Sequence, residues 1–356
     1  LSAQAAQLEG DDQAARRYFE AMLENPETRF LGLRGLLTQA LRDGDHAAAL
    51  DYAKRAYALR PRTGWVATTL FDLSERQGDL AAAEQALDDA LRAKALPAPE
   101  AQRKRAVLLT EKAMRIESAD PDEARKLARR ARKLAPELVP ATALLARLMI
   151  EGRDNGKAAR LLEEAWRLAP HPELAALYAR ARPGGNGLER LQALARLTAN
   201  RPDHVESHLA LARAALEARL WGEARRHLKA AAAPGGLDDA PGETVCRLMA
   251  ELEEAEHGDT KAARRWLTRA AEAPPDPAWT CRACGAVAPD WSARCGACQA
   301  FDSLDWRSPP RVLAGPGDES APRASLAAPD GPAAAPAEGA AANSGETALG
   351  RAAASG

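Results

Sequence analysis

The chain has 356 residues, in which 49 Lys and Arg face 50 Asp and Glu, and only 4% of the residues are aromatic. A net charge near zero argues against a nucleic-acid-binding protein, because such proteins usually carry a basic excess. No run of about 18 apolar residues occurs, so no segment of this sequence is expected to span a membrane. Scarce aromatic residues beside abundant Leu and Ala favour packed helices over sheets.

The sequence opens at Leu1, inside a segment, LSAQAAQLEG, that has the composition of a helix. This segment would need another turn upstream to complete a helix of the length seen later in the chain. We therefore expect that the native N-terminus, with any targeting or membrane segment it carries, precedes Leu1.

A unit that recurs along the chain is clearest between Gly44 and Pro61. Ala49, Ala53 and Ala56 fall on one face of a helix with 3.6 residues per turn, so a second helix can approach that face closely. Pro61 cannot continue the helix, because it lacks the backbone N–H. The unit is therefore predicted to be the second helix of a helix-turn-helix pair.

The alanine five residues after the turn of this unit returns at a nearly constant interval. It recurs at Ala15, Ala49, Ala83, Ala124, Ala158, Ala224 and Ala263, with Arg190 replacing it once, in steps of 34, 34, 41, 34, 32, 34 and 39 residues. A 34-residue period with small residues at fixed offsets is the signature of tetratricopeptide repeats. The predicted fold is therefore all-α, a tetratricopeptide-repeat solenoid of about eight helix pairs.

Two irregularities interrupt the period. The segment from Leu96 to Glu117 is longer than its equivalents, and we assign the excess to a loop at Pro97 and Pro99. The run Arg182-Pro-Gly-Gly-Asn-Gly187 is a strong helix breaker. It is predicted to divide the repeats into one half over residues 1–182 and another over residues 183–277.

The densest basic run lies on the predicted helix from about Pro121 to Leu134. Its apolar positions form a separate face, so the Arg and Lys side chains are expected to be solvated. The alternative is a contact with anionic lipid head groups or with an acidic partner. Elsewhere, Cys246 lies beside Leu248 and Met249 and is predicted to be a small buried residue.

Metal-binding chemistry is concentrated in residues 278–307, where Cys281 and Cys284 form one C-x2-C pair and Cys295 and Cys298 form a second. Each pair can bend into a knuckle that directs two thiolates at one cation, and Gly285 suits the turn of the first knuckle. Four thiolates close the coordination sphere and leave no position for a substrate. The segment is therefore predicted to be a zinc-ribbon or rubredoxin-like module with structural zinc, and iron is the second choice because a rubredoxin site uses the same ligands.

Two other uses of the cysteines are less favoured. Disulfides are not needed in a helix-rich chain with its own core, and a redox C-x2-C would be expected on a thioredoxin-like strand and helix. The module also holds Trp279, Trp291, Phe301 and Trp306. We expect these aromatic residues to dock the module on the last helix pair, near Trp266, and to cap the open end of the solenoid. Residues 308–356, rich in Pro, Ala, Gly and Ser, are predicted to be a disordered tail.

Several strings together carry a family resemblance: AAQLEGDDQAARRYFEAMLENPETRFLGLRGLL, WGEARRHLKAAA, CRLMAELEEAEHGD and the closing four-cysteine segment up to Trp306. They resemble the repeat region of the HemY-type proteins of alphaproteobacteria. The resemblance implies an inner-membrane protein with two N-terminal transmembrane helices, absent here, and a repeat domain on the cytoplasmic side that is linked to porphyrin and haem biosynthesis. It implies no catalytic residues, and only the four cysteines carry over, as a metal site.

The same plan is similar to that of LapB, an adaptor that regulates lipopolysaccharide synthesis, in which a metal module packs on the repeats. Because one fold can serve adaptors with different clients, the fold does not choose between these two functions.

An enzyme is the weaker class, because the sequence contains no G-x-G-x-x-G fingerprint and no C-x-x-C-H haem attachment motif. Of the six histidines only His204 and His208 share a helical face, and we interpret this pair as a polar helix start. The predicted function is a non-enzymatic scaffold whose concave face, lined by the first helices of the pairs, recruits client proteins such as haem-pathway enzymes. A tetrapyrrole-binding protein is a further alternative.

Overall fold

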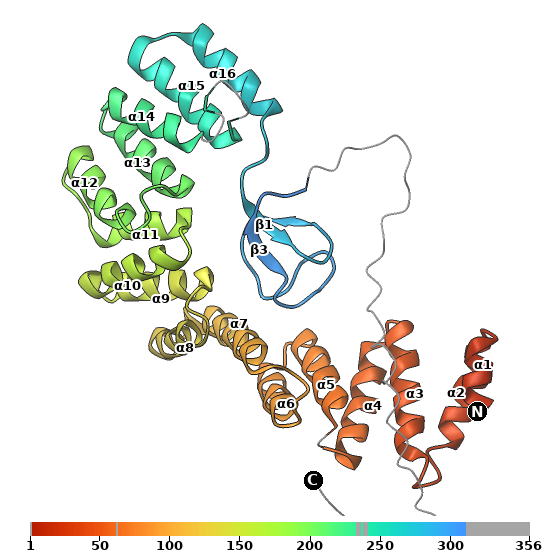
Figure 1. The fold of residues 1–356 in the computed structure, drawn as a ribbon. Helices are drawn as coiled ribbons and strands as arrows, with labels where there is room; N and C mark the ends of the chain where they lie inside the picture. Colours follow the sequence, from red (N-terminus) through yellow and green to blue (C-terminus); the bar gives the residue numbers. More distant parts are fainter. Residues whose placement is uncertain (1, 62, 233–235, 238–240, 311–356) are drawn as a thin grey trace, which may run out of the picture. The chain divides into compact units, whose positions relative to one another are not determined.

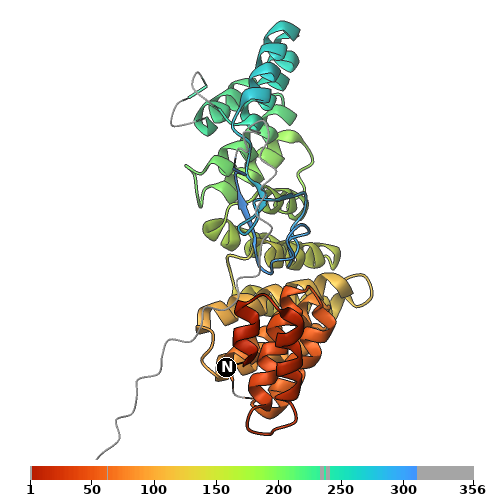
Figure 2. The same cartoon turned by 90° about the vertical axis from the view of Figure 1, so that its right-hand side faces the viewer.

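The structure is a computed structural model that describes residues 2–61, 63–232, 236–237 and 241–310. Within these ranges the chain forms sixteen helices and then three short strands, and Figures 1 and 2 show the helices following one another from α1 in red to α16 in cyan. The helices are α1 (Ser2–Leu8), α2 (Asp12–Ala21), α3 (Arg29–Arg42), α4 (His46–Leu59), α5 (Gly64–Arg76), α6 (Leu80–Arg92), α7 (Ala98–Ile116), α8 (Pro121–Leu134), α9 (Val139–Glu151), α10 (Asn155–Leu168), α11 (Pro172–Ala181), α12 (Gly187–Thr198), α13 (Val205–Glu217), α14 (Trp221–Ala231), α15 (Glu243–His257) and α16 (Thr260–Glu272). The prediction of about eight helix pairs is confirmed.

The recurring alanines lie where successive helices touch. Those of the second helices α2, α4, α6, α8, α10 and α14 have no exposed surface, namely Ala15, Ala49, Ala83, Ala124, Ala158 and Ala224. Arg190, which replaces the alanine in α12, is exposed and forms an ion pair with Glu217 of α13. Small side chains at the other positions let the helix axes approach, which is why the 34-residue period is visible in the sequence.

The turn between the two helices of a pair is built from a glycine and an aspartate. Gly44 has a φ of +73°, a conformation that favours glycine, and Asp45 then caps α4 by accepting a hydrogen bond from the Ala48 N–H at 2.9 Å. The same Gly-Asp pair precedes α2, α6 and α16, at Gly10-Asp11, Gly78-Asp79 and Gly258-Asp259. The turn therefore fixes where the second helix begins in these four pairs.

The extra length near Leu96 lies in a helix and not in a loop, so our assignment of it to a loop at Pro97 and Pro99 is wrong. Helix α7 has 19 residues, compared with 13 in α5, and Pro99 lies in its first turn. A proline is tolerated there because the first N–H groups of a helix have no partner within the helix. The excess length therefore lies in the first helix α7 itself.

The apolar core continues across the predicted breaker at residues 182–187. Leu177 and Tyr178 of α11 belong to the same buried cluster as Leu194 and Leu197 of α12. The division into halves over residues 1–182 and 183–277 stays a prediction. Apart from residues 308–310, the predicted disordered tail lies outside the described residues.

Helix α8 buries the apolar face that was predicted, but its basic side chains are not all free in solvent. Arg125 lies 3.4 Å from Asp154, at the start of α10, and Arg132 lies 2.6 Å from Glu164 in α10. Part of the basic run therefore joins two neighbouring second helices. Cys246 has no exposed surface, which confirms its prediction as a buried residue.

Candidate metal centre

The first cysteine, Cys281, lies at the end of the central strand of a three-stranded sheet. Strand β1 (Ala278–Cys281) lies between β2 (Val287–Ala288) and β3 (Leu304–Arg307), and both pairings are antiparallel. Trp279 faces Trp306 across the β1–β3 pair, and Cys281 faces Leu304. The cysteine therefore ends a strand that is paired with a neighbouring strand on each side.

The first knuckle closes directly after β1. The Cys281 N–H donates to the Ala286 carbonyl at 2.8 Å, and the Gly285 N–H donates back to the Cys281 carbonyl at 3.0 Å. Gly285 has a φ of +75°, a conformation that only glycine adopts without strain, as the sequence led us to expect. Cys284, the residue before Gly285, is exposed.

The second knuckle repeats the first. The Cys295 N–H donates to the Ala300 carbonyl at 3.0 Å, and the Gln299 N–H donates to the Cys295 carbonyl at 2.9 Å. Gln299 occupies the position of Gly285 and also has a positive φ, +61°. A left-handed glutamine costs about 1 kcal/mol, which the two hydrogen bonds offset in part, and no sequence signal marks it.

The knuckles bring all four predicted ligands together. The sulfur atoms of Cys281, Cys284, Cys295 and Cys298 lie within 4.8 Å of one another, with 3.6 Å between Cys281 and Cys298 and 3.7 Å between Cys284 and Cys295. A tetrahedron with metal–sulfur bonds of about 2.3 Å has edges of about 3.8 Å. The cluster could thus hold a metal ion, whereas a disulfide would need about 2.05 Å. Zinc and iron both accept four thiolates, so the choice of zinc stays a prediction.

The pKa values of the cluster thiols differ widely. Burial acts to raise the pKa of Cys281, but its hydrogen bond with the Ser303 hydroxyl and the hydrogen bonds it accepts from backbone N–H groups, including that of Ala283, outweigh burial and lower this pKa to about 6. Burial and the neighbouring thiols raise the pKa of Cys298 to about 12. Four thiols this close cannot all lose their protons without a cation to offset the negative charge.

The module (residues 278–307) docks on helices in the middle of the repeats. Phe301 meets Phe71 of α5 edge to face, with 5.3 Å between the ring centroids. The guanidinium of Arg103, on α7, donates to both carboxylate oxygens of Asp302 at 3.0 Å. Such a two-pronged arrangement is among the stronger polar contacts in proteins.

A second ion pair lies deeper in the same contact. Arg294 of the module pairs with Glu75 of α5, whose exposed fraction is 2%, and also donates to the Asp72 carbonyl at 3.3 Å. A charge buried to this extent is costly unless it is paired. Arg294 and Glu75 therefore depend on each other, and no motif in the sequence marks either role.

A buried histidine joins the module to α11. The exposed fraction of His171 is 3%, and its ring lies 4.3 Å from that of Trp306 and 5.3 Å from that of Trp279, measured between centroids. Its Nδ1 accepts a hydrogen bond from the Glu173 N–H at 3.2 Å, which caps the helix. Burial lowers the pKa of His171 to about 4, so the ring is neutral at pH 7.

Our prediction that the module docks on the last helix pair and caps the open end is wrong. Its contacts reach α5, α7 and α11, all first helices of their pairs. Trp266 of α16 instead packs against a core cluster formed by α13, α14 and α15 and lies under the guanidinium of Arg269. The physical reason is that the complementary partners, one aromatic ring, one histidine and two charges, lie on these earlier helices.

Three other histidines contact their own helix or a neighbouring one. His204 caps α13 by accepting a hydrogen bond from the Glu206 N–H at 3.1 Å, which confirms the predicted polar helix start. His208 does not act with His204; its Nδ1 lies 3.2 Å from Nδ1 of His227 on α14. Sequence spacing alone could not show this contact, because the two residues belong to different helices.

Comparison with known proteins identifies the repeats. The family described as "Tetratricopeptide repeat" matches residues 115–181, from the end of α7 through α11. The helix pairs are tetratricopeptide repeats. A fold of this kind is typically a non-enzymatic scaffold for protein–protein interaction.

One curated relative and two solved structures illustrate the likeness. "Probable magnetosome protein Mms48" of Magnetospirillum gryphiswaldense is 33% identical over 243 residues, which are 66% of this chain and 52% of that protein, so the chain spans about half of its length. YrrB, described as "a TPR protein with an unusual peptide-binding site", is 14% identical, with 53% of this chain and 95% of that chain covered and a TM-score of 0.32. The human IFIT1 dimer with m7Gppp-AAAA is 14% identical, with 76% and 67% covered and a TM-score of 0.34.

Within the described residues, no helix is both long enough and apolar enough to cross a membrane.

Proposed function

We propose that this protein is a non-enzymatic scaffold at the inner membrane that recruits client proteins through its tetratricopeptide repeats. The observation that carries the proposal is the series of eight helix pairs, part of which matches the tetratricopeptide-repeat family. The surface formed by the first helices of the pairs (α1, α3, α5, α7, α9, α11, α13 and α15) is called here the first-helix face. The module takes part of it, at α5, α7 and α11.

Parts of the first-helix face carry no polar contact to the module. Among the described residues, no hydrogen bond or ion pair joins residues 278–307 to α1, α3, α13 or α15, whereas Arg103 and Glu75 hold the module on α7 and α5. Client proteins would therefore meet two stretches of repeat surface with the module between them. A client that spans the centre would touch the repeats and the module together.

The clients are proposed to be enzymes of porphyrin and haem biosynthesis, with the repeats on the cytoplasmic side. This part is supported by the resemblance of the strings between Leu1 and Trp306 to the HemY-type proteins. A LapB-like adaptor for envelope lipid synthesis would use the same architecture. A third alternative is a set of magnetosome proteins as clients, because the Magnetospirillum relative is named a probable magnetosome protein.

The metal has a structural role in this proposal. Cys281, Cys284, Cys295 and Cys298 would hold zinc, which ties the two knuckles together and supplies no open coordination position. Side chains of the module then dock it on the repeats. Strands β1 and β3 place Trp279 and Trp306 against His171, and the loop between the knuckles places Arg294 against Glu75.

Affinity capture from solubilised membranes with the full-length native protein tests this function. The comparison is with a form in which Cys281 and Cys295 are replaced by serine. Recovery of porphyrin-pathway enzymes by the native protein alone is the expected result. Recovery of envelope-lipid enzymes or of a membrane protease would move the protein to the LapB-like function, and a Soret shift on adding protoporphyrin to the purified chain would favour tetrapyrrole binding instead.

A further inference from the structure

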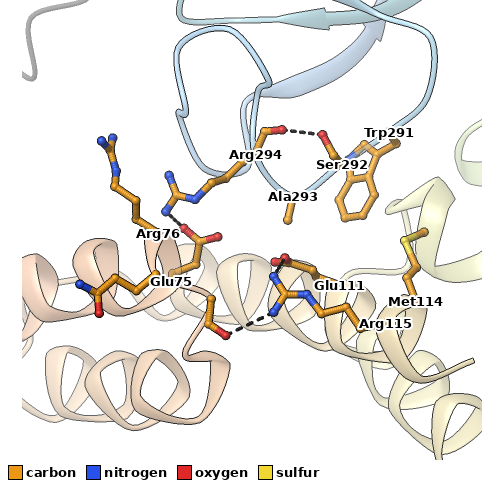
Figure 3. Close-up of a pocket in the computed structure, with 11 residues that line it drawn as sticks. Glu75, Arg76, Glu111, Met114, Arg115, Trp291, Ser292, Ala293 and Arg294 are labelled. Carbon is orange, nitrogen blue, oxygen red and sulfur yellow. Dashed lines mark hydrogen bonds and ion pairs between the residues drawn. The ribbon is translucent and has the colours of Figure 1, made fainter. Parts of the chain in front are cut away.

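Where the module meets α5, the arginines have acidic neighbours within the chain. Figure 3 shows Arg294 of the module paired with Glu75, and the charge of Asp72 acts on both Arg294 and Arg76. The positive charges in this part of the first-helix face are therefore matched. An unmatched charge has to be sought on first helices that the module does not contact.

Helix α3 has a different charge pattern. It contains three arginines and neither Asp nor Glu, and α1, the first helix before it, contains no charged residue. Arg29 donates to the Leu23 carbonyl at 2.8 Å, and Arg42 is exposed in the last turn. Arg34, in the middle of the helix, is partly buried. These two first helices therefore carry positive charge alone, with Arg34 at its centre.

Arg34 belongs to a row in which guanidinium groups and aromatic rings are in contact. Its guanidinium carbon lies 5.5 Å from the ring centroid of Trp65, at the start of α5. The ring of Trp65 lies 5.8 Å from that of Phe30, between centroids. The centroid of Phe30 in turn lies 4.5 Å from the guanidinium carbon of Arg60, directly after α4. These four residues are called here the arginine–aromatic row.

Neither arginine of this row has an acidic partner. Among the residues that the structure describes, no carboxylate lies within ion-pair distance of Arg34 or Arg60, and this includes Glu27 and Asp43, which flank α3. Stacking on a ring uses the flat face of a guanidinium and leaves the N–H donors at its edge free, in an arrangement that matches a carboxylate. A guanidinium held by a ring also loses less conformational freedom on binding. The row therefore presents two positioned guanidinium groups to an anionic ligand.

An exposed leucine lies beside the row. Leu31 is 54% exposed and precedes Arg34 by three residues, so both side chains lie on the same face of α3. A single exposed leucine is common on protein surfaces and would mean little alone. Next to an unpaired guanidinium, however, it offers an apolar contact to whatever the guanidinium binds. The surface thus combines positive charge with one apolar position.

Two classes of macromolecule carry suitable negative charge, namely acidic protein segments and anionic membranes. Binding to anionic lipids typically uses clusters of about four to eight Lys and Arg. The row has two arginines, and α1 and α3 contain no lysine. One or two carboxylates of a protein segment match this number better than a charged lipid surface does.

We propose that the arginine–aromatic row and Leu31 bind an acidic segment of a client protein. An Asp or Glu carboxylate of the segment lies on the edge of the Arg34 guanidinium, and a large apolar side chain of the same segment lies on Leu31. A second acidic residue is attracted by Arg60. The proposal rests on the scaffold function and names the chemistry of one of its client sites.

The test uses the intact, zinc-loaded chain and a library of synthetic octapeptides with blocked ends, in which one position at a time is fixed. Blocking the ends ensures that every negative charge belongs to a side chain. Pools with a fixed Asp or Glu are expected to bind more tightly than pools with a fixed Asn or Gln. In the best single peptide, replacing the carboxylate by its amide is expected to weaken binding about tenfold or more, as measured by fluorescence anisotropy.

Four variants of the chain assign this effect to residues. On Arg34→Gln the acid and the amide peptides should bind alike, whereas Arg34→Lys keeps the charge and should recover part of the affinity. Leu31→Ala should weaken both peptides equally. Arg160→Gln, which removes an exposed arginine of α10, is the matched control and should bind as the unmodified chain does. Circular dichroism before each titration shows whether the variants keep their helices.

A photoreactive group on the best peptide locates the site without any variant. Cross-links are expected within residues 29–42 of α3 or residues 64–76 of α5. If Arg34→Gln does not fold, the cross-links and the comparison of acid with amide on the unmodified chain still decide the proposal.

The other outcomes overturn this site. Cross-links elsewhere, equal binding of acid and amide, or no binding of any acidic pool would each exclude it and leave the scaffold function to another part of the first-helix face. Co-sedimentation with phosphatidylglycerol vesicles covers the second class: vesicle binding that Arg34→Gln abolishes would assign the row to a membrane instead. The capture of client proteins from membranes judges the scaffold function separately.

Discussion

His171 is predicted to make the contact between the module and the repeats unstable in acid. Burial lowers its pKa from 6.5 to about 4 in the folded chain. Between these two values the unfolded chain binds a proton that the folded chain does not, so the free energy of unfolding falls as the pH falls. At 1.36 kcal/mol for each pKa unit, the full loss between pH 6.5 and pH 4 is about 3 kcal/mol.

The perturbation that isolates this effect is His171→Asn. Asparagine does not titrate, and its side-chain oxygen can still accept the hydrogen bond that His171 takes from the Glu173 N–H at the start of α11. The variant loses ring contacts with Trp279 and Trp306 at every pH, so the comparison uses the slope of stability with pH and not its absolute value.

Urea unfolding followed by tryptophan fluorescence at several pH values between 7 and 4.5 measures both slopes. Below pH 6 the unmodified chain should lose about 1 kcal/mol per pH unit more than the variant does. Acid also protonates His208, His227 and the thiolate of Cys281, but these groups are the same in both chains and cancel in the difference. Equal slopes, or an imidazole of His171 that titrates near pH 6.5 by NMR, would refute the reasoning.

Three more predictions concern the metal cluster, the docking contact and the repeat core. Cys298→Ser should reduce the bound metal well below about one ion per chain by mass spectrometry, whereas Cys246→Ser, buried outside the cluster, should keep it. Arg103→Ala leaves Asp302, whose side chain is 11% exposed, without its partner. This variant should weaken docking of the module by about 1–3 kcal/mol and speed proteolysis at residues 273–277. Arg16→Ala breaks an exposed pair with Glu20 and should change neither docking nor proteolysis. Ala83→Leu should lower the melting temperature by overfilling the helix contact, at a cost of about 1–3 kcal/mol, whereas Ala81→Leu on the exposed side of α6 should leave it nearly unchanged.

The repeats could be predicted from the sequence because their determinants are local and recur. Ala49, Ala83 and Ala124 have no exposed surface, and any larger side chain there would push two helices apart, so the period of small residues records the packing directly. The knuckles could be predicted for a similar reason, since each needs only two cysteines and a turn within a few residues. The length of α7 was assigned wrongly because a proline in the first turn of a helix resembles a loop signal.

The place where the module docks could not be predicted, because its determinants are far apart in the chain. Arg103 and Asp302 are 199 residues apart, and neither belongs to a motif. The tryptophans of the module indicated that it docks on something apolar but not where, since α16 also offers a tryptophan. Only the joint placement of Phe71, Glu75 and His171 on three first helices decides between these surfaces.

The metal cluster and the docking contact share one strand, which couples them physically. Trp279 and Cys281 are two residues apart in β1 and therefore point to the same side of the sheet, where both are buried. An ion that fixes the Cys281 thiolate also fixes the strand that presents Trp279 to His171. Because coupling between two sites is reciprocal, docking on the repeats must strengthen metal binding by the same free energy with which the metal strengthens docking. The module is thus neither a free appendage nor an end cap, and an ion bound to its four cysteines would stabilise its contact with the repeats as well as its own fold.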